Sequence, residues 1–309
     1  MALIMDGRKI AYMARQSLIG KIQALSKEQS VVPHLAIIVV GDGLTSRAYV
    51  KHKVKACQEV GIKATLFKEA ANASEAAVLA IVQQLNADPL VHGIIVQLPL
   101  PTSINPWLIT QAIDPLKDVD GLHAINYGRM AYNQPTHIPA TPLGILMLLA
   151  HHQIRAANKH CVIVGRGHTV GTPLNIILSR NSYFGNGTVT LCHSYTKNLA
   201  NFTCQADILI VAAGKPGLIE PSMVKSGAVV IDVGLTQVAD HTKKLGYCLQ
   251  GDVDFKKVVS RCSYVTPVPG GVGPMTIVAL LTNTFRAAAR QVYTSAGTLE
   301  AIIGLNPYY

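Results

Sequence analysis

Charged residues are scarce in this sequence, and acidic residues are scarcer than basic ones. Only 14% of the 309 residues are Asp, Glu, Lys or Arg, whereas 49% are hydrophobic, which excludes an intrinsically disordered chain. The 27 Lys and Arg outnumber the 17 Asp and Glu, and the formal net charge is +10. Because no long run of basic residues occurs, a small anionic ligand is favoured over a nucleic-acid partner, although a folded basic patch stays open.

Several sequence signals are missing. The six cysteines form no Cys-x-x-Cys pair and no Cys/His cluster with zinc spacing, so we expect no metal site and reduced thiols in a cytoplasmic protein. Asp6 and Arg8 interrupt the N-terminal apolar residues too early for a signal peptide. Two charge-free stretches, 89–113 and 130–154, each contain at least three prolines, which excludes a membrane-spanning helix there.

Strand-like and helix-like segments alternate along the chain, which is typical of parallel βαβ units. In the first part the pattern predicts strands at 34–40, 64–67 and 92–98, and helices at 8–25, from 45 or 46 to 60, and at 74–85 with Ser74 as its cap. Residues 99–142 are rich in Pro, Asn and Gly and predict a loop region before an apolar helix at 143–150. A second series predicts strands at 161–164, 188–192, 207–212, 228–233 and 263–266, and a last helix at about 276–296. The sequence therefore predicts an α/β protein of two domains.

A glycine-rich turn follows the strand at 161–164. Gly165, Gly167 and Gly171 precede a helix, so the backbone can approach a pyrophosphate and the helix N-terminus can supply free N–H groups. The alternative is a tight strand-to-helix turn that binds no ligand. The strand before the turn and the helix after it favour dinucleotide binding.

The next strand indicates which dinucleotide binds. NAD sites usually carry an acidic residue at its end, which bonds the ribose 2′-hydroxyl. Here no Asp or Glu occurs between Gly165 and Asp207, while Arg166 lies in this segment and the strand ends at His193-Ser194. NADP is therefore favoured over NAD. For His193, capping of the following turn explains the residue as well as a ligand contact does.

Lys53 is the main candidate for chemistry in the first part of the chain. It shares a helical stripe with Tyr49, Ala56 and Val60. A buried lysine has a lowered pKa and can act as a general acid or base, but on the helix alone a snorkelling lysine is the simpler interpretation. Tyr-x-x-x-Lys is also the pair of short-chain dehydrogenases; we reject that interpretation because the pair here precedes the glycine-rich turn and lies in another domain.

Two further polar residues follow predicted strands or turns. Gln97 lies at the end of the strand 92–98, where parallel sheets bind ligands, and its amide can orient Lys53, bond a substrate carbonyl, or simply satisfy the loop backbone. Asp120 can accept two N–H bonds from an amino-pyrimidinone edge. Either Asp118 or Asp120 equally fits a turn residue beside Gly121.

Taken in order, five strings give a resemblance that covers nearly the whole chain. They are YVKHK (49–53), VQLPLP (96–101), KDVDGL (117–122), GRGHTVGTP (165–173) and TPVPGGVGPMT (266–276). The series resembles the bifunctional methylenetetrahydrofolate dehydrogenase/methenyltetrahydrofolate cyclohydrolase family, and VQLPLP and PGGVGPMT are its most specific strings.

The resemblance implies an NADP-dependent oxidation of 5,10-methylene-tetrahydrofolate, followed by hydrolysis of the 5,10-methenyl product to 10-formyl-tetrahydrofolate. It implies an N-terminal βαβ catalytic domain of residues 1–139 with 275–309, a Rossmann-like NADP-binding domain of residues 140–274, and a cleft between them. It also implies a cytoplasmic homodimer in one-carbon metabolism and purine biosynthesis. The +10 charge suits polyglutamylated folates. No formate synthetase activity is expected, because no GxxxxGK[ST] loop occurs.

The resemblance also assigns site residues. Lys53 matches the catalytic lysine, Tyr49 a residue that packs on and bonds the folate, and Gln97 the residue that holds the lysine. Asp120 matches the carboxylate that anchors the pterin. Further substrate contacts are expected at Val96, Leu98, Pro269, Gly270, Gly271 and Gly273. Cofactor contacts are expected at Gly165, Arg166, Gly167, Ser194 and Leu235.

Two positions depart from the family pattern. Gly167 stands where many members have serine, so a hydroxyl contact to phosphate is lost, and Ala140 stands where a cysteine is usual. Two other functions were weighed: a dehydrogenase with weak cyclohydrolase activity, and a non-catalytic NADP-binding or nucleic-acid-binding protein. The intact set of Tyr49, Lys53, Gln97 and Asp120 argues against both.

Overall fold

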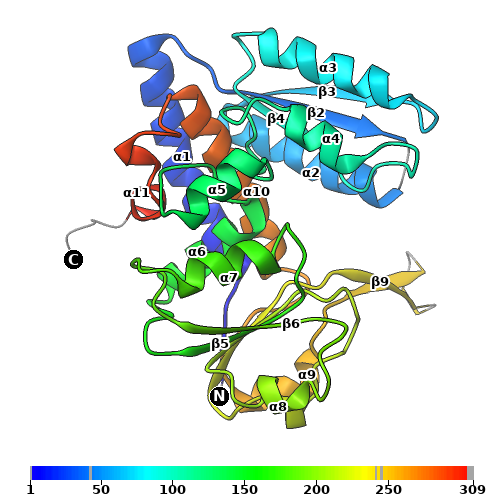
Figure 1. The fold of residues 1–309 in the computed structure, drawn as a ribbon, viewed down its shortest axis with the longest axis vertical. Coiled ribbons are helices and arrows are strands. Elements are labelled where there is room, and N and C mark those ends of the chain that lie inside the picture. Colours follow the sequence, from blue (N-terminus) through cyan, green and yellow to red (C-terminus); the bar gives the residue numbers. More distant parts are fainter. Residues whose placement is uncertain (1, 42–43, 241, 244–245, 305–309) are drawn as a thin grey trace. The chain divides into compact units, whose positions relative to one another are not determined.

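The structure is a computed structural model that describes residues 2–41, 44–240, 242–243 and 246–304, without the side chains of 44–49. It divides into two compact units, each with its own sheet (Figure 1). Residues 13–140 and 277–309 form the small-sheet unit, and residues 1–12 and 141–276 form the large-sheet unit. The chain passes between the units at 12/13 and 276/277, inside the long helices α1 (Gly7–Gln29) and α10 (Val272–Ala288), and at 140/141, at the start of α6 (Ala140–His151).

The small-sheet unit is built on three parallel strands in the order β3-β2-β4. They are β2 (His34–Val40), β3 (Lys63–Glu69) and β4 (Gly93–Val96). Every residue of β2 is buried, as expected for the central strand of a covered parallel sheet. Ala36, Ile38 and Val40 form one core cluster with apolar residues of two helices, α3 (Glu75–Ala87) and α4 (Pro106–Ala112).

Other helices complete this unit. They are α1 (Gly7–Gln29), α2 (Leu44–Val60), α5 (Ala124–Ala131), α10 (Val272–Ala288), η3 (Ser295–Gly297) and α11 (Leu299–Ile303). The Ser74 hydroxyl accepts the Ala77 N–H at 3.2 Å, so the predicted cap of α3 is confirmed. Gly61 adopts a φ of +84° and ends α2, a conformation that glycine adopts without strain.

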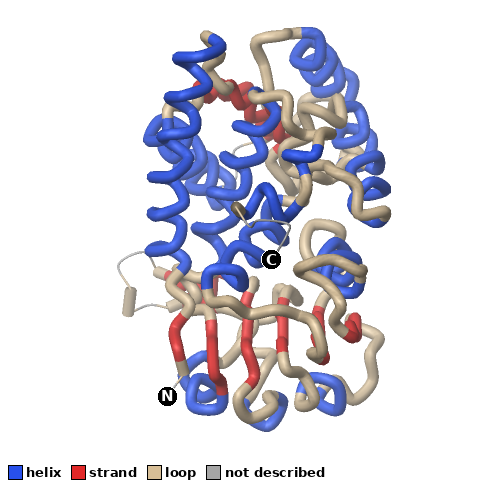
Figure 2. The backbone as a smooth tube through the Cα atoms, turned by 90° about the vertical axis from the view of Figure 1, so that its left-hand side faces the viewer, coloured by secondary structure: helices blue, strands red, loops and turns tan. Residues whose placement is uncertain are grey.

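The large-sheet unit contains six parallel strands in the order β1-β11-β8-β7-β5-β6, which lie side by side in Figure 2. They are β1 (Leu3–Ile4), β5 (His160–Val164), β6 (Thr188–Cys192), β7 (Ile208–Val211), β8 (Ala228–Asp232) and β11 (Cys262–Val265). A separate antiparallel pair is formed by β9 (Thr236–Ala239) and β10 (Tyr247–Gln250). The helices are α6 (Ala140–His151), α7 (Gly171–Ser179), α8 (Ala200–Thr203), η1 (Pro221–Met223), α9 (Phe255–Val258) and η2 (Val259–Arg261).

Two expected elements differ from the structure, while the domain bounds 1–139 with 275–309 and 140–274 stay a prediction. Residues 1–12 lie in the large-sheet unit, where β1 pairs with β11 and extends the larger sheet. The expected loop region 99–142 contains α4 and α5. The last long helix, α10, spans Val272–Ala288 rather than 276–296, and two short helices follow it.

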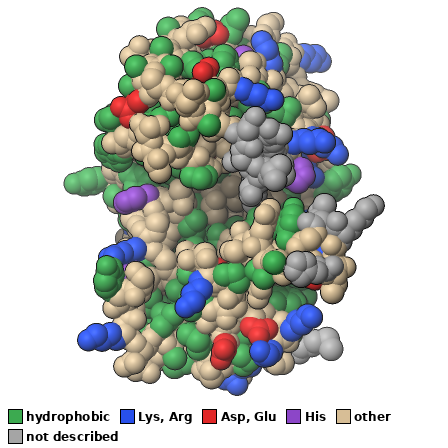
Figure 3. All heavy atoms as spheres, turned by 90° about the vertical axis from the view of Figure 1, so that its right-hand side faces the viewer, with side chains coloured by type: hydrophobic (Ala, Val, Ile, Leu, Met, Phe, Trp, Pro, Cys, Tyr) green, Lys and Arg blue, Asp and Glu red, His purple; other side chains and the backbone are tan. Residues whose placement is uncertain are grey.

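Among the described residues, no helix is long and apolar enough to cross a membrane. On the face shown in Figure 3, Lys and Arg side chains are dispersed among uncharged and acidic ones rather than gathered in a continuous stripe. That face therefore lacks the clustered basic surface that nucleic-acid-binding domains present.

Candidate functional site

Lys53 lies in the middle of α2, on the side of the helix that packs into the small-sheet unit. Its neighbours on this side, Ala56, Cys57 and Val60, are buried, and Lys53 itself is half-buried. The ammonium group donates a hydrogen bond to the amide oxygen of Gln97, with 3.0 Å between Nζ and Oε1. The Tyr49 side chain lies outside the described residues. The helix therefore presents Lys53 to the end of β4.

Gln97 is held in one orientation by its own backbone surroundings. Its N–H donates to the Ile38 carbonyl (2.8 Å), so the ladder between β2 and β4 continues one residue beyond β4. The side-chain Nε2 donates to the Leu98 carbonyl (2.9 Å), which leaves Oε1 to face Lys53. The Gln97 side chain therefore presents its hydrogen-bond acceptor, and not its N–H donors, to the Lys53 ammonium group.

Burial and a nearby carboxylate act on the Lys53 amine in opposite directions. Burial lowers the pKa of Lys53, while the nearby Asp120 carboxylate opposes that shift. Burial likewise raises the pKa of Asp120, and Lys53 opposes that shift. Burial raises the pKa of Cys57, one helical turn further along α2, to about 12, so its thiol stays protonated. Lys53 and Asp120 therefore form a coupled pair in a poorly solvated place.

The segment that carries Asp120 is fixed from both sides. Asp118 is buried, and its Oδ2 accepts N–H bonds from the His123 backbone and the Asn126 side chain, both at 2.8 Å. On the other side, the Asn283 amide on α10 donates to the Val119 carbonyl at 2.9 Å. Of the two aspartates, Asp118 thus holds the turn, and Asp120 is left to interact with Lys53.

The large-sheet unit holds the glycine-rich turn that was expected to bind a dinucleotide. Gly165 follows β5 with a φ of +116°, and a side chain there would overlap the Ala212 carbonyl. A Cβ at Gly171 would overlap the Gly165 carbonyl oxygen, so these two glycines let α7 begin directly against the strand. No side chain caps α7, but the Thr172 N–H donates to the Gly167 carbonyl at 3.1 Å and Pro173 has no N–H, so the helix start offers few N–H groups to a phosphate. In contrast, Gly167 has open space around its Cα, so its departure from serine has no steric cause.

The end of β6 lies beside this turn, because β5 and β6 are neighbouring strands. Ser194 and Arg166 are both exposed there. The ring of His193 accepts the Tyr195 N–H at 3.3 Å, so His193 has the turn-forming role that was weighed against ligand binding. The segment 165–206 contains no Asp or Glu, so no carboxylate of this segment would repel a 2′-phosphate.

The remaining expected contacts are divided between the two units. Val96 is buried at the end of β4, and Leu98 follows it in the small-sheet unit, as do Lys53, Gln97 and Asp120. Leu235, 38% exposed between β8 and β9, belongs to the large-sheet unit. The segment 269–273 also belongs to that unit; it follows the cis Val268–Pro269 bond and runs into the first turn of α10, and the Gly270 carbonyl accepts the Arg8 N–H at 3.2 Å.

Asp232 and Asp252 are buried aspartates that were not predicted from the sequence. They hold the loops that follow β7, β8 and β10. Asp232 ends β8 and accepts the N–H groups of Gly234, Asp252 and Val253 at 2.9–3.0 Å. Asp252 accepts those of Ala213 and Gly214, after β7, at 2.7 and 2.9 Å. Burial raises the pKa of Asp232 to about 6. Asp232 could have been found from the sequence, because it is an acidic residue at the end of the apolar strand β8.

Comparison with known families decides between the possibilities that this geometry leaves open. The model of the tetrahydrofolate dehydrogenase/cyclohydrolase catalytic domain matches residues 5–120, and that of the NAD(P)-binding domain of the same name matches residues 139–292. The chain belongs to the tetrahydrofolate dehydrogenase/cyclohydrolase family. The resemblance inferred from the five strings is confirmed, as is the two-domain α/β fold.

Individual members of the tetrahydrofolate dehydrogenase/cyclohydrolase family are similar over almost their full length. "Bifunctional protein FolD" of Amoebophilus asiaticus is 61% identical, covering 96% of this chain and 99% of its own. The solved FolD structure from Campylobacter jejuni has a TM-score of 0.88 at 42% identity, covering 94% of this chain and 100% of its own. The Trypanosoma brucei FolD, solved with NADP and an inhibitor, has a TM-score of 0.90 at 36% identity, covering 94% and 98%.

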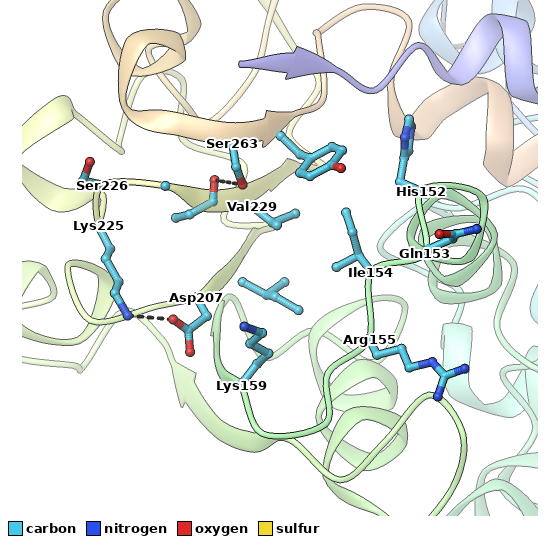
Figure 4. A pocket seen from close by; sticks show the side chains of 14 residues that line it. His152, Gln153, Ile154, Arg155, Lys159, Asp207, Lys225, Ser226, Val229 and Ser263 are labelled. Atoms are coloured by element: carbon cyan, nitrogen blue, oxygen red, sulfur yellow. Dashed lines mark hydrogen bonds and ion pairs between the residues drawn. The ribbon is translucent and has the colours of Figure 1, made fainter. Parts of the chain in front are cut away.

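This family member has another pocket, of about 340 Å³, where β7, β8 and β11 begin in the large-sheet unit. It lies at the opposite strand ends from the glycine-rich turn. Figure 4 shows Lys225 directed at Asp207, with 2.6 Å between the charged groups. Ser263 is bonded to the Ala228 carbonyl. None of the expected site residues is among the residues that line it, so it is separate from the candidate sites.

Proposed function

We propose that this chain is a bifunctional enzyme that oxidises 5,10-methylene-tetrahydrofolate with NADP and hydrolyses the resulting 5,10-methenyl-tetrahydrofolate to 10-formyl-tetrahydrofolate. The observation that carries the proposal is the hydrogen bond between Lys53 and Gln97, with Asp120 close by, in a chain that matches both domains of the family. A binding protein without catalysis would have no need of a half-buried lysine oriented by an amide.

The large-sheet unit fits NADP. The close approach of Gly165 and Gly171 lets the backbone of the turn come near a pyrophosphate. Exposed Arg166 and Ser194 suit a 2′-phosphate. When bound, NADP supplies the acceptor for the hydride that leaves the methylene carbon. The contribution of the protein to this step is alignment, with Gly165, Arg166, Gly167, Ser194 and Leu235 as the proposed contacts.

The small-sheet unit is proposed to bind the folate and to move protons. Asp120 accepts N–H bonds from the amino-pyrimidinone edge, and Tyr49 packs on the folate. In the hydrolysis, water adds to the cationic methenyl carbon and one of its protons is released. The carbon–N5 bond then breaks as the remaining hydroxyl proton passes to N5, which leaves the formyl group on N10. Neutral Lys53 takes the proton from the attacking water, and Gln97 holds the amine in place. Further folate contacts are proposed at Val96, Leu98, Pro269, Gly270, Gly271 and Gly273.

We also propose the form of the folate substrate, the location of the protein and its oligomeric state. The net charge of +10 supports polyglutamylated folates as substrates, which a weak salt dependence of their affinity would contradict. The six free cysteines support a cytoplasmic location. Family membership supports a homodimer, which light scattering on the purified protein would test.

A two-cofactor assay tests the function. The purified protein receives methylene-tetrahydrofolate with NADP or with NAD, and reduced cofactor, methenyl-folate and 10-formyl-folate are measured separately. We expect NADP-dependent reduction with little methenyl-folate accumulating. Accumulation would indicate a dehydrogenase with a weak second step. The absence of turnover with either cofactor, from folded protein, would reject the enzyme.

Lys53→Met separates the two steps. The methionine keeps the length of the side chain but cannot carry a proton, so we expect cyclohydrolase activity to be abolished and dehydrogenase activity to be largely retained. Normal hydrolysis by this variant would remove Lys53 from its proposed role.

A further inference from the structure

Tyr195 is an aromatic residue that none of the expected contacts includes, although it lies at the end of β6. Its side chain is 81% exposed, so the ring is accessible to a bound molecule. The guanidinium carbon of Arg166 lies 5.8 Å from the centre of this ring. The pair bridges the two loops that follow neighbouring strands, because Val164 of β5 is aligned with Cys192 of β6.

Arg166 has a fixed backbone but a side chain held by little else. Its carbonyl accepts the Thr172 hydroxyl at 2.9 Å, which ties the loop to the first turn of α7. Within the described part of the chain, the Arg166 guanidinium group contacts the Tyr195 ring and forms neither an ion pair nor a hydrogen bond. A long arginine side chain has many rotamers, and a flat ring beside it reduces their number.

The ring itself is carried by a closed turn. The His193 N–H donates to the Thr196 hydroxyl at 2.9 Å, and the Thr196 N–H donates back to the His193 carbonyl at 2.8 Å. The Tyr195 N–H donates to the His193 ring, which also meets the Tyr195 ring edge-on at 6.3 Å. These bonds fix the backbone that carries Tyr195, and the His193 ring contacts the Tyr195 ring from one side.

Tyr195 follows β6, the second strand of the series, where dinucleotide-binding folds distinguish NADP from NAD, and the Arg166 guanidinium group reaches its ring from the loop after β5. We propose that Tyr195 is a positioning residue for cofactor specificity, whose ring holds the Arg166 guanidinium where it meets the 2′-phosphate of NADP. This inference rests on the proposed NADP-dependent function and extends it to a residue outside the expected contacts. Tyr195 has no part in binding NAD, which lacks the phosphate.

The test compares Tyr195→Ala and Tyr195→Phe with the wild type, using NADP and NAD. An exposed cation–π contact predicts a two- to five-fold rise in the KM for NADP in Tyr195→Ala, at unchanged kcat. The KM for NAD stays the same. Tyr195→Phe keeps the ring and behaves as the wild type. Tyr132→Ala, which removes another highly exposed tyrosine (83%) in the small-sheet unit, is the matched control and changes neither constant.

A double-mutant cycle with Arg166→Ala completes the experiment. If Tyr195 acts through Arg166, Tyr195→Ala has no further effect on NADP once Arg166 is gone. An additional loss in that background, an equal loss for NAD, or a Phe variant as weak as the Ala variant would overturn the inference. Calorimetric titration of NADP and NAD repeats the comparison without turnover. A wild type that binds NADP but turns over no folate would reject the proposed function and leave the binding comparison decisive for Tyr195.

Discussion

A carboxylate in place of the Gln97 amide should stop the second reaction while sparing the first. In Gln97→Glu, a negative charge would stand about where Oε1 now lies, 3.0 Å from the Lys53 ammonium group. At an effective dielectric constant near 20, two unit charges at such a distance attract by about 5.5 kcal/mol. That corresponds to a rise of roughly four units in the pKa of Lys53. It would reverse the lowering that burial produces.

The neutral amine that we propose for hydrolysis would then be rare. Near neutral pH its fraction falls by up to about 10,000-fold, so we expect cyclohydrolase kcat to fall by roughly three to four orders of magnitude. The rate should recover about tenfold for each pH unit between 7 and 9, after the spontaneous hydrolysis of methenyl-folate is subtracted. Dehydrogenase activity should change far less, and methenyl-folate should accumulate in the coupled assay.

Gln97→Met is the matched control, because it removes the hydrogen bond without adding charge. Loss of one such bond predicts a cyclohydrolase decrease of only about tenfold. If the Glu and Met variants lose the same activity, or if the Glu variant shows no recovery at higher pH, the charge state of Lys53 does not govern the reaction.

Three other changes probe separate parts of the molecule. Asp120→Ala should raise the KM for folate at least tenfold and leave that for NADP unchanged; equal losses would indicate a disturbed fold. Gly171→Ala places a methyl group against the Gly165 carbonyl and should weaken NADP binding about tenfold in a calorimetric titration, with folate KM unaffected. Burial raises the pKa of Asp118 to about 6 from 3.8, so the folded state holds a proton that the unfolded chain releases, and its contribution to stability is lost as the pH rises from about 4 to 6. Asp118→Asn should remove up to roughly 3 kcal/mol of this loss of folding free energy. Denaturant unfolding at several pH values measures it. Identical pH dependence of the two proteins would refute the raised pKa of Asp118.

The sequence predicted the elements whose signals are local. The apolar run 34–40 is β2 at the predicted residues, and Ser74 caps α3 as expected. In the region 99–142 the same kind of signal was present but was outweighed by composition. Asn105, followed by Pro106, caps α4 by accepting the Trp107 N–H. The two-residue strand β1 has no local signal, because it exists only through its pairing with β11.

Site residues were predictable where periodicity or strand ends marked them, and not where tertiary contacts decide. Helical spacing placed Lys53 on an inward stripe, and the end of β4 marked Gln97. Nothing local distinguished Asp118 from Asp120. Their difference comes from Asn126 on α5, which bonds Asp118. It also reflects Asn283, more than 150 residues away in sequence, whose amide holds the residue before Asp120.

The pairing of β1 with β11 also bears on how the protein is made. During synthesis the first strand leaves the ribosome early, yet its partner, Tyr264, follows only after most of the chain. At ordinary rates of translation that delay is roughly 10 to 50 seconds. The small-sheet unit waits as well, because Asn283 must arrive before its amide can bond the Val119 carbonyl. A chain that stops early therefore completes neither unit, and a growing chain exposes apolar strand surface for most of its synthesis.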